Sequence, residues 1–212
     1  MYPVGPTKFE HSLFEQEWLI DDYIMTPDGN KVWDVHHCKD TWLVSEPFIN
    51  RARNAIDIGC RDGEYTHFLL KRFGHIFCFD YRGRKLFPNN VDISKVTHFK
   101  CALGEETKII KASGGGSISS SKTPIERQLD LQLHRLDDFN LKNIDYIKID
   151  VDGFELRVLQ GATNTINTYK PLLVIEQENN DTSAIEFCIE KFNYQVVVWD
   201  SKHRNVIMRS KI

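Results

Sequence analysis

The stretch IDYIKIDVDG (144–153) reads like a buried strand but carries charges that a buried strand rarely tolerates. Lys148 stands between two isoleucines, and Asp150 and Asp152 follow it. Residues two apart in a strand point to the same face, so Lys148 and Asp150 should lie side by side. A carboxylate so placed could orient and deprotonate a hydroxyl, and a desolvated lysine could tune that carboxylate or itself accept a proton.

Each of these charges also has a structural explanation. Lys148 would neutralise Asp57 or Asp150 as a buried pair inside the sheet. Asp152 and Glu155 would begin the next helix, because an acid in the first turn complements the helix dipole. We favour a functional role for Asp150, which ends a strand, and a structural role for Asp152 and Glu155. For Lys148 both roles stay open.

The elements that must position these residues alternate along the chain. Predicted strands cover 54–59, 75–80, 96–103, 144–150 and 171–177, and predicted helices cover 64–73, 154–166 and 183–192. This alternation indicates a parallel sheet with helices on both faces. The last two strands, 194–200 and 205–210, are separated by too short a link for a crossover and must form an antiparallel hairpin. The fold class predicted is an α/β doubly wound sheet of the class I methyltransferase (Rossmann-like) type, mostly parallel with a C-terminal antiparallel hairpin.

A single domain is predicted over residues 1–212, with two additions to this core. Residues 1–40 form an N-terminal extension, in which the Pro-Asp-Gly turn of YIMTPDGNKVWDV predicts a hairpin. Residues 104–140 form an insertion after the third strand. It contains SGGGSISSS (113–121), which is flexible by composition, and LDLQLHRL (129–136), a candidate extra strand.

A glycine turn after the first strand is the first sign of a cofactor. The segment AIDIGCRDGEYTHFLL (55–70) places Asp57, Gly59 and Gly63 across a strand-to-helix junction. Glycines allow a tight turn and close approach of a ligand, and the free N–H groups of a helix start can face that ligand. The G-x-x-x-G spacing differs from the G-x-G-x-x-G of dinucleotide folds and favours a ligand without a pyrophosphate.

Two further strand ends complete the predicted cofactor site. Asp80 ends the second strand and could accept hydrogen bonds from both ribose hydroxyls of an adenosine, while Ala102 and Leu103 at the end of the third could pack on its adenine. The alternative is that the glycines only turn the chain and Asp80 only caps a loop. The predicted cofactor-binding residues are Asp57, Gly59, Cys60, Arg61, Gly63, Asp80, Tyr81, Ala102, Leu103 and Asp150.

Together these motifs resemble the FkbM-type methyltransferases. The resemblance rests on IDIGCRDGEYT, CALGEET, HRLDDF and IDYIKIDVDGFELRVLQGATNTINTYKPLLVIEQE, and runs from about residue 43 to the C-terminus. It implies S-adenosyl-L-methionine as cofactor and O-methylation of a hydroxyl on a sugar, glycan or other small molecule. The family more often has Glu at Asp152, Glu-Pro at Asp80-Tyr81, and a small or amide residue near Arg61.

The predicted catalytic residues are Asp150, Lys148 and Glu176, the last at the end of the fifth strand. His134 is an outside candidate for the base. Asp150, Glu176 and Asn179 could gather oxygens for Mg²⁺, but the acid–asparagine pair usual in catechol-type O-methyltransferases is missing from EQENN (176–180), so no metal is predicted. The adjacent His36 and His37 lack a second ligand pair for zinc and are expected near the mouth of the site.

Composition limits the setting and the partners. The net charge of −3 and pI of about 6.2 disfavour bulk nucleic-acid binding and anionic membranes. The five cysteines form no C-x-x-C pair, and no signal peptide or spanning run is recognised, so a reduced, cytoplasmic setting is predicted. The expected partner is a small-molecule or glycan acceptor. The alternatives are a ribose 2′-O-methyltransferase acting on nucleic acid and a non-catalytic interaction module; glycine spacing and the terminal hairpin exclude an NAD oxidoreductase.

Overall fold

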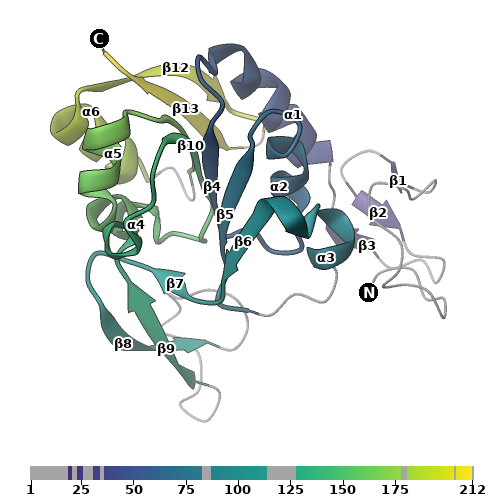
Figure 1. Cartoon of the computed structure of the whole chain (residues 1–212), viewed down its shortest axis with the longest axis horizontal. Coiled ribbons are helices and arrows are strands. Elements are labelled where there is room, and N and C mark those ends of the chain that lie inside the picture. Colours follow the sequence, from purple (N-terminus) through teal and green to yellow (C-terminus); the bar gives the residue numbers. More distant parts are fainter. Residues whose placement is uncertain are drawn as a thin grey trace.

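The computed structural model describes residues 19–20, 23–25, 31–33, 36–82, 87–113, 128–177, 181–202 and 204–211. Its main sheet has seven strands in the order β12-β13-β11-β10-β4-β5-β6 (Figure 1). These strands are β4 (Asn54–Ile58), β5 (His75–Phe79), β6 (Val96–Phe99), β10 (Ile144–Ile149), β11 (Leu172–Glu176), β12 (Tyr194–Asp200) and β13 (Asn205–Ser210). Neighbours from β6 to β11 pair in parallel, and β13 pairs antiparallel with both β11 and β12. The predicted fold class is therefore confirmed.

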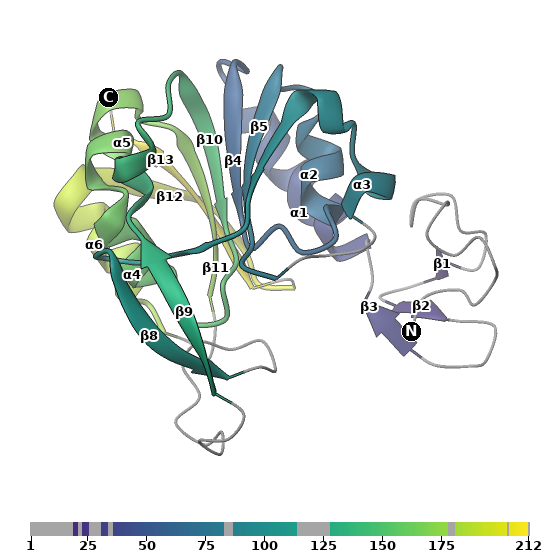
Figure 2. The same ribbon diagram turned by 60° about the horizontal axis from the view of Figure 1, so that its bottom comes forward.

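Helices cover both faces of this sheet (Figure 2). One layer holds α1 (His36–Ser45), α2 (Glu64–Leu69) and α3 (Phe87–Asn90), and the other holds α4 (Glu155–Gly161), α5 (Thr163–Tyr169) and α6 (Ser183–Phe192). Along β10, Ile147 and Ile149 enter the core beneath α4–α6, whereas Tyr146 enters the core beneath α1 and α2. Lys148 follows the same alternation as Tyr146, so it points into the α1–α2 layer.

The chain changes direction between β4 and β10, which are neighbours in the sheet although far apart in sequence. From β4 the strands proceed through β5 to β6 on one side, and from β10 through β11 on the other. In doubly wound sheets, the crevice outside the carboxyl ends of such a pair is where ligands bind. The backbone N–H of Asp150 donates to the Ile58 carbonyl at 3.0 Å and holds the two strand ends together there.

The predicted third strand, 96–103, is two strands in different sheets. β6 stops at Phe99, level with the end of β5, and β7 (Ala102–Leu103) turns away to join β9 (Gln128–His134) and β8 (Lys108–Ser113) in the order β7-β9-β8. The strand predicted at 129–136 is confirmed as β9. The small sheet thus begins at β7, before residue 104, because β9 offers β7 a parallel partner outside the main sheet. Most of SGGGSISSS lies outside the described residues.

Other boundaries also differ from the prediction. The helix predicted at 64–73 ends at Leu69, and the one predicted at 154–166 is divided into α4 and α5 at Ala162. The division follows Gly161. A Cβ added there would lie 2.0 Å from the carbonyl oxygen of Gly104, which directly follows β7, so only glycine allows this close approach.

The N-terminal region contains a separate three-stranded sheet of β1 (Leu19–Ile20), β2 (Tyr23–Met25) and β3 (Lys31–Trp33). β2 and β3 pair antiparallel, as the predicted hairpin requires, although its turn lies outside the described residues. α1 begins at His36, so the core layer starts within the predicted extension. In the described part of the chain, no helix has the length and apolarity needed to cross a membrane.

Candidate active site

Four ionisable side chains meet at the carboxyl edge of the sheet. Lys148 Nζ donates to Asp150 Oδ2 at 3.0 Å, and Arg204 Nη2 donates to Glu176 Oε1 at 2.9 Å. The carboxyl groups of Glu176 and Asp150 lie close enough for each to shift the pKa of the other, which couples the two pairs. The Asp150 side chain is 29% exposed, against 3% for Lys148 and 6% for Glu176. Asp150 is therefore the member of the acid pair that an incoming molecule could touch.

These contacts set the protonation states. Burial opposes ionisation of Asp150, but the Lys148 charge and hydrogen bonds from Glu176 and Lys148 outweigh it and lower its pKa to about 2. Burial and then the Asp150 charge raise the pKa of Glu176 to about 9. Burial disfavours the Lys148 ammonium, yet the charges of Asp150 and Glu176 overcome it and raise the Lys148 pKa. At neutral pH the acid pair thus holds one proton, on Glu176, and Lys148 is a cation rather than a proton acceptor.

On the α1–α2 side of the sheet, Lys148 lies over the ring of Tyr65, whose hydroxyl group contacts those of Tyr146 and Ser45. Its Nζ lies 5.7 Å from the centre of the Tyr65 ring, within reach of a cation–π interaction. The Tyr65 and Tyr146 hydroxyl oxygens are 2.5 Å apart, and Ser45 Oγ lies 2.8 Å from Tyr146 Oη. The buried hydroxyls satisfy one another and leave the ammonium directed at Asp150. The sequence did not predict this group of hydroxyls because its residues come from three separate elements, α1, α2 and β10.

Asp57 is the register partner of Lys148 across β4 and β10, but its carboxylate is used elsewhere. Its Oδ2 accepts a hydrogen bond from Thr66 Oγ1 at 2.5 Å, which ties β4 to α2. The residue is 1% exposed, and burial raises its pKa to about 6. Of the two neutralising partners considered for Lys148, the structure selects Asp150.

The glycines of the turn are required by the packing of the chain itself. Gly59 and Gly63 have φ of 84° and 87°, in the left-handed region. A Cβ on Gly59 would lie 1.8 Å from the Asp150 carbonyl oxygen, and one on Gly63 would lie 2.7 Å from Cγ1 of Val91. Gly59 thereby allows the turn to lie directly against the end of β10, beside the acid pair.

Asp80 fastens the same turn to the end of β5. Its Oδ2 accepts from the backbone N–H of Arg61 at 3.2 Å, and its Oδ1 accepts from that of Arg82 at 2.7 Å. The side chain is 3% exposed. These contacts hold the carboxylate at the carboxyl end of β5, beside the glycine turn.

The remaining predicted cofactor residues have different surroundings. Ala102 packs with Leu133 and Phe154 in a small apolar cluster against which Tyr81, the sequence neighbour of Asp80, is placed. Leu103 faces the core beneath α4–α6 and is 3% exposed. Cys60 is buried, with its Sγ 3.8 Å from Nε2 of His98. The structure thus places Tyr81 against the cluster that holds Ala102, and it buries Leu103 and Cys60.

At the start of the helix that follows β10, Glu155 and Asp152 have different roles. Glu155 Oε1 accepts from the backbone N–H groups of Val151 and Gly153 at 3.2 and 3.1 Å, which confirms its structural role. Asp152 is exposed with φ of 55° and precedes the N-cap residue Phe154, so it forms the turn before the helix and does not cap it.

Histidines and possible metal ligands complete the surroundings. His37, in the first turn of α1, is close enough to Asp150 for its charge to favour the ionised carboxylate. His134 packs edge-on against Phe139, with ring centres 5.9 Å apart. Asn179 lies outside the described residues, and those that are described hold no group of three or more His, Cys, Asp or Glu suited to a metal.

A family model described as "Methyltransferase FkbM domain" matches residues 24–196. The chain belongs to this family. The FkbM match begins within β2, earlier than the resemblance predicted from about residue 43, and ends in β12 rather than at the C-terminus. It includes the glycine turn, the acid pair and Asp80.

Solved structures share the fold of this FkbM domain at low sequence identity. A methyltransferase FkbM from Methylobacillus flagellatus has a TM-score of 0.55 and 18% identity over 74% of this chain and 43% of that chain, so the present chain spans less than half of its length. A precorrin-8w decarboxylase from Methanobacterium thermoautotrophicum has a TM-score of 0.52 and 12% identity, over 91% and 98% of the two chains. A ribosomal-protein methylase from Lactobacillus delbrueckii has a TM-score of 0.52 and 10% identity, over 88% and 84%. A search of curated proteins found no significant match.

Proposed function

We propose that this chain transfers a methyl group from S-adenosylmethionine to a hydroxyl group on a sugar, glycan or other small molecule. One observation carries the proposal: Asp150, ionised and 29% exposed, directly follows β10 and lies beside the glycine turn that follows β4. A carboxylate at this edge is placed to orient a hydroxyl, and family membership supports methyl transfer as the reaction.

The residues around the turn fit an adenosine-containing cofactor. Asp80 lies at the end of β5, where a carboxylate can accept from ribose hydroxyls, and Tyr81, packed against the cluster that holds Ala102, offers an apolar surface for a base. The Gly59–Gly63 turn places backbone N–H groups at the start of α2. S-adenosylmethionine, when bound, supplies an electrophilic methyl group on a sulfonium sulfur.

The acid pair would manage the proton of the acceptor. Asp150 accepts a hydrogen bond from the hydroxyl and so aims its oxygen. As the bond from the methyl carbon to sulfur breaks, the hydroxyl oxygen gains its third bond and develops positive charge. Its proton becomes strongly acidic, so a weakly basic carboxylate is sufficient to remove it. Lys148 holds Asp150 in place at 3.0 Å, and the proton on Glu176 prevents repulsion between the two carboxyls.

Two measurements test this proposal. Calorimetric titration with S-adenosylmethionine and S-adenosylhomocysteine is expected to show saturable binding, and binding of neither compound would refute the cofactor assignment. Methyl transfer to a panel of sugars and glycans, with RNA as a separate arm, is then compared in the wild type, Asp150→Asn and the matched control Asp152→Asn. Asp150→Asn should bind the cofactor but lose at least about 100-fold in turnover, and the control should not. Equal turnover in Asp150→Asn and the wild type would exclude Asp150 as the proton acceptor.

A further inference from the structure

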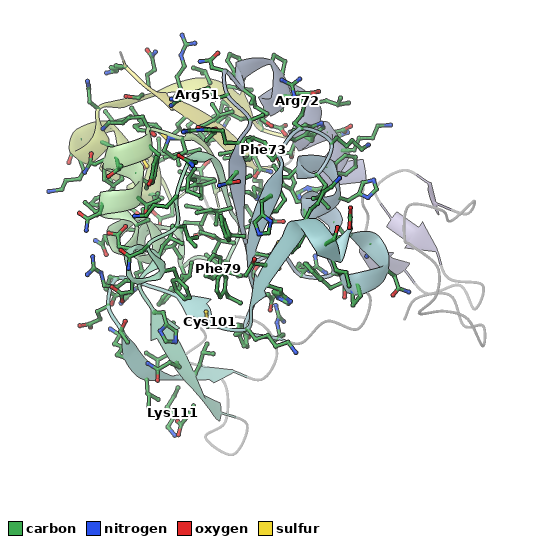
Figure 3. The ribbon with its side chains drawn as sticks, in the orientation of Figure 1. Arg51, Arg72, Phe73, Phe79, Cys101 and Lys111 are labelled. Carbon is green, nitrogen blue, oxygen red and sulfur yellow. The ribbon has the colours of Figure 1, made fainter. Side chains whose placement is uncertain are left out.

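The amino edge of the main sheet carries a pocket of about 530 Å³. Its walls include Phe48 of the 3-10 helix η2 (Glu46–Phe48), Leu172 at the start of β11, and the basic side chains of Arg51, Lys170, Arg209 and Lys211. Asp145, also in its wall, precedes Asp150 by five residues on β10, or about 17 Å along an extended strand. Figure 3 shows Arg51 at the end of the molecule opposite Cys101 and Lys111. The pocket is therefore separate from the candidate active site.

The acid in this pocket is already paired. Arg53 donates Nε to Asp145 Oδ2 at 2.9 Å and Nη2 to Oδ1 at 2.6 Å, a two-pronged contact. Arg53 also donates its backbone N–H to Oδ2 at 2.9 Å. Arg51 reaches the same carboxylate only at 3.6 Å through Nε. Asp145 is thus largely neutralised by Arg53, and the guanidinium of Arg51 retains donors for another anion.

The other three cations have no acidic partner among the residues that the structure describes. Lys170 Nζ donates to neutral acceptors, Asn167 Oδ1 at 3.1 Å and the Phe192 carbonyl at 3.5 Å. Arg209 and Lys211 lie two apart on one side of the chain at the end of β13, both exposed. Several exposed cations elsewhere are paired with acids, as in Lys111 with Asp130. In a protein with 27 basic and 30 acidic residues, this local excess is a property of the pocket and not of the composition.

We propose that this pocket binds a small molecule carrying a phosphate or diphosphate group. Two guanidinium forks and two ammonium groups match an anion with several oxygens and more than one charge. Phe48 and Leu172 give the pocket an apolar part for the organic portion of the ligand. Its volume lies within the range of small-molecule sites. The site does not depend on the methyl-transfer proposal, because it uses none of the same residues.

The test is calorimetric titration of the full chain with inorganic pyrophosphate and with uridine diphosphate at physiological ionic strength. The double variant Arg209→Gln/Lys211→Gln is compared with Lys95→Gln/Lys111→Gln, which removes the same charge at exposed positions away from the pocket. Thermal unfolding of both variants checks that each remains folded. We expect the pocket variant to weaken binding of the tighter probe by at least about tenfold and the control by less than about twofold.

The two probes distinguish the sources of the phosphate. Equal binding of both would mean that the phosphate group alone is recognised, and tighter binding of uridine diphosphate would assign a role to the apolar wall. The proposal is overturned if neither probe binds saturably to the wild type, or if both double variants weaken binding equally. A third titration uses a long RNA oligonucleotide, and the proposal is also overturned if that RNA binds with a steep dependence on salt while neither small probe binds.

Discussion

Replacing Glu176 with glutamine is expected to make the protein more stable at neutral pH. Glu176 is 6% exposed, and burial with the adjacent Asp150 charge raises its pKa to about 9. Glutamine preserves both contacts, since its amide N–H can donate to Asp150 as the protonated carboxyl does. Its carbonyl oxygen can accept from Arg204, which now donates to Glu176 Oε1 at 2.9 Å. The substitution therefore removes only the proton that Glu176 must take up when the chain folds at neutral pH.

The size of the effect follows from proton linkage. Unfolded glutamate has a pKa near 4.3, so at neutral pH the wild type must take up a proton on Glu176 when it folds. That uptake costs about 4 kcal/mol at neutral pH, because each of the roughly 2.7 units between the unfolded pKa and pH 7 costs about 1.4 kcal/mol. A raised carboxyl pKa gives stability that is fully present below the unfolded pKa and is lost as pH rises towards about 9. The advantage of Glu176→Gln should therefore grow with pH.

Urea unfolding between about pH 5 and about pH 8 measures this advantage directly. The wild type, Glu176→Gln and the control Glu190→Gln, at an exposed carboxyl on α6, are compared at each pH. The expected gap between wild type and Glu176→Gln is small at the acidic end and widens by about 1.4 kcal/mol per pH unit. A gap that does not change with pH, or a variant less stable throughout, would refute the protonated state of Glu176.

Three further substitutions test other parts of the site. Lys148→Met should lower the free energy of urea unfolding by about 3 kcal/mol, because it removes one member of a buried ion pair. It should also raise the Asp150 pKa and so move the acidic limb of the pH–rate profile to higher pH, and a limb that does not move would contradict the ion pair. Gly59→Ala should cost more than about 2 kcal/mol because its Cβ would lie 1.8 Å from the Asp150 carbonyl oxygen, whereas the control Gly74→Ala, with its nearest atom at 3.4 Å, should unfold much like wild type. Asp80→Asn should weaken S-adenosylmethionine binding by at least about tenfold in calorimetry, and unchanged affinity would remove Asp80 from the cofactor site.

The sequence predicted the sheet well because its signal is local. Apolar runs alternating with helical spacing indicated the parallel strands, and the short link before residue 205 indicated the closing hairpin. The break between β6 and β7 escaped prediction because 96–103 is continuously strand-like. Its division depends on β9, a partner that comes much later in the chain. Local preference cannot distinguish one long strand from two short ones that pair with different neighbours.

Residues of the site escaped prediction for the same reason. Arg204 lies in the turn of the closing hairpin and reaches Glu176 because β13 pairs with β11. Its only trace in the sequence is a basic residue in the short link SKHR (201–204), which is typical of any exposed turn. The Ser45–Tyr65–Tyr146 hydroxyl contacts likewise join α1, α2 and β10, and nothing in their spacing relates them.

The sequence by itself determined that Lys148 and Asp150 share one face of a strand ending at the ligand-binding edge, since side chains in a strand alternate with a period of two. Only the tertiary structure determined the partner, the exposure and the protonation state of each of these groups. It made Lys148 the cation that fixes Asp150, made Asp150 the exposed carboxylate, and left the proton on Glu176. Protonation depends on burial and on charges a few ångströms away, and these come from strands and turns that meet only in the folded chain.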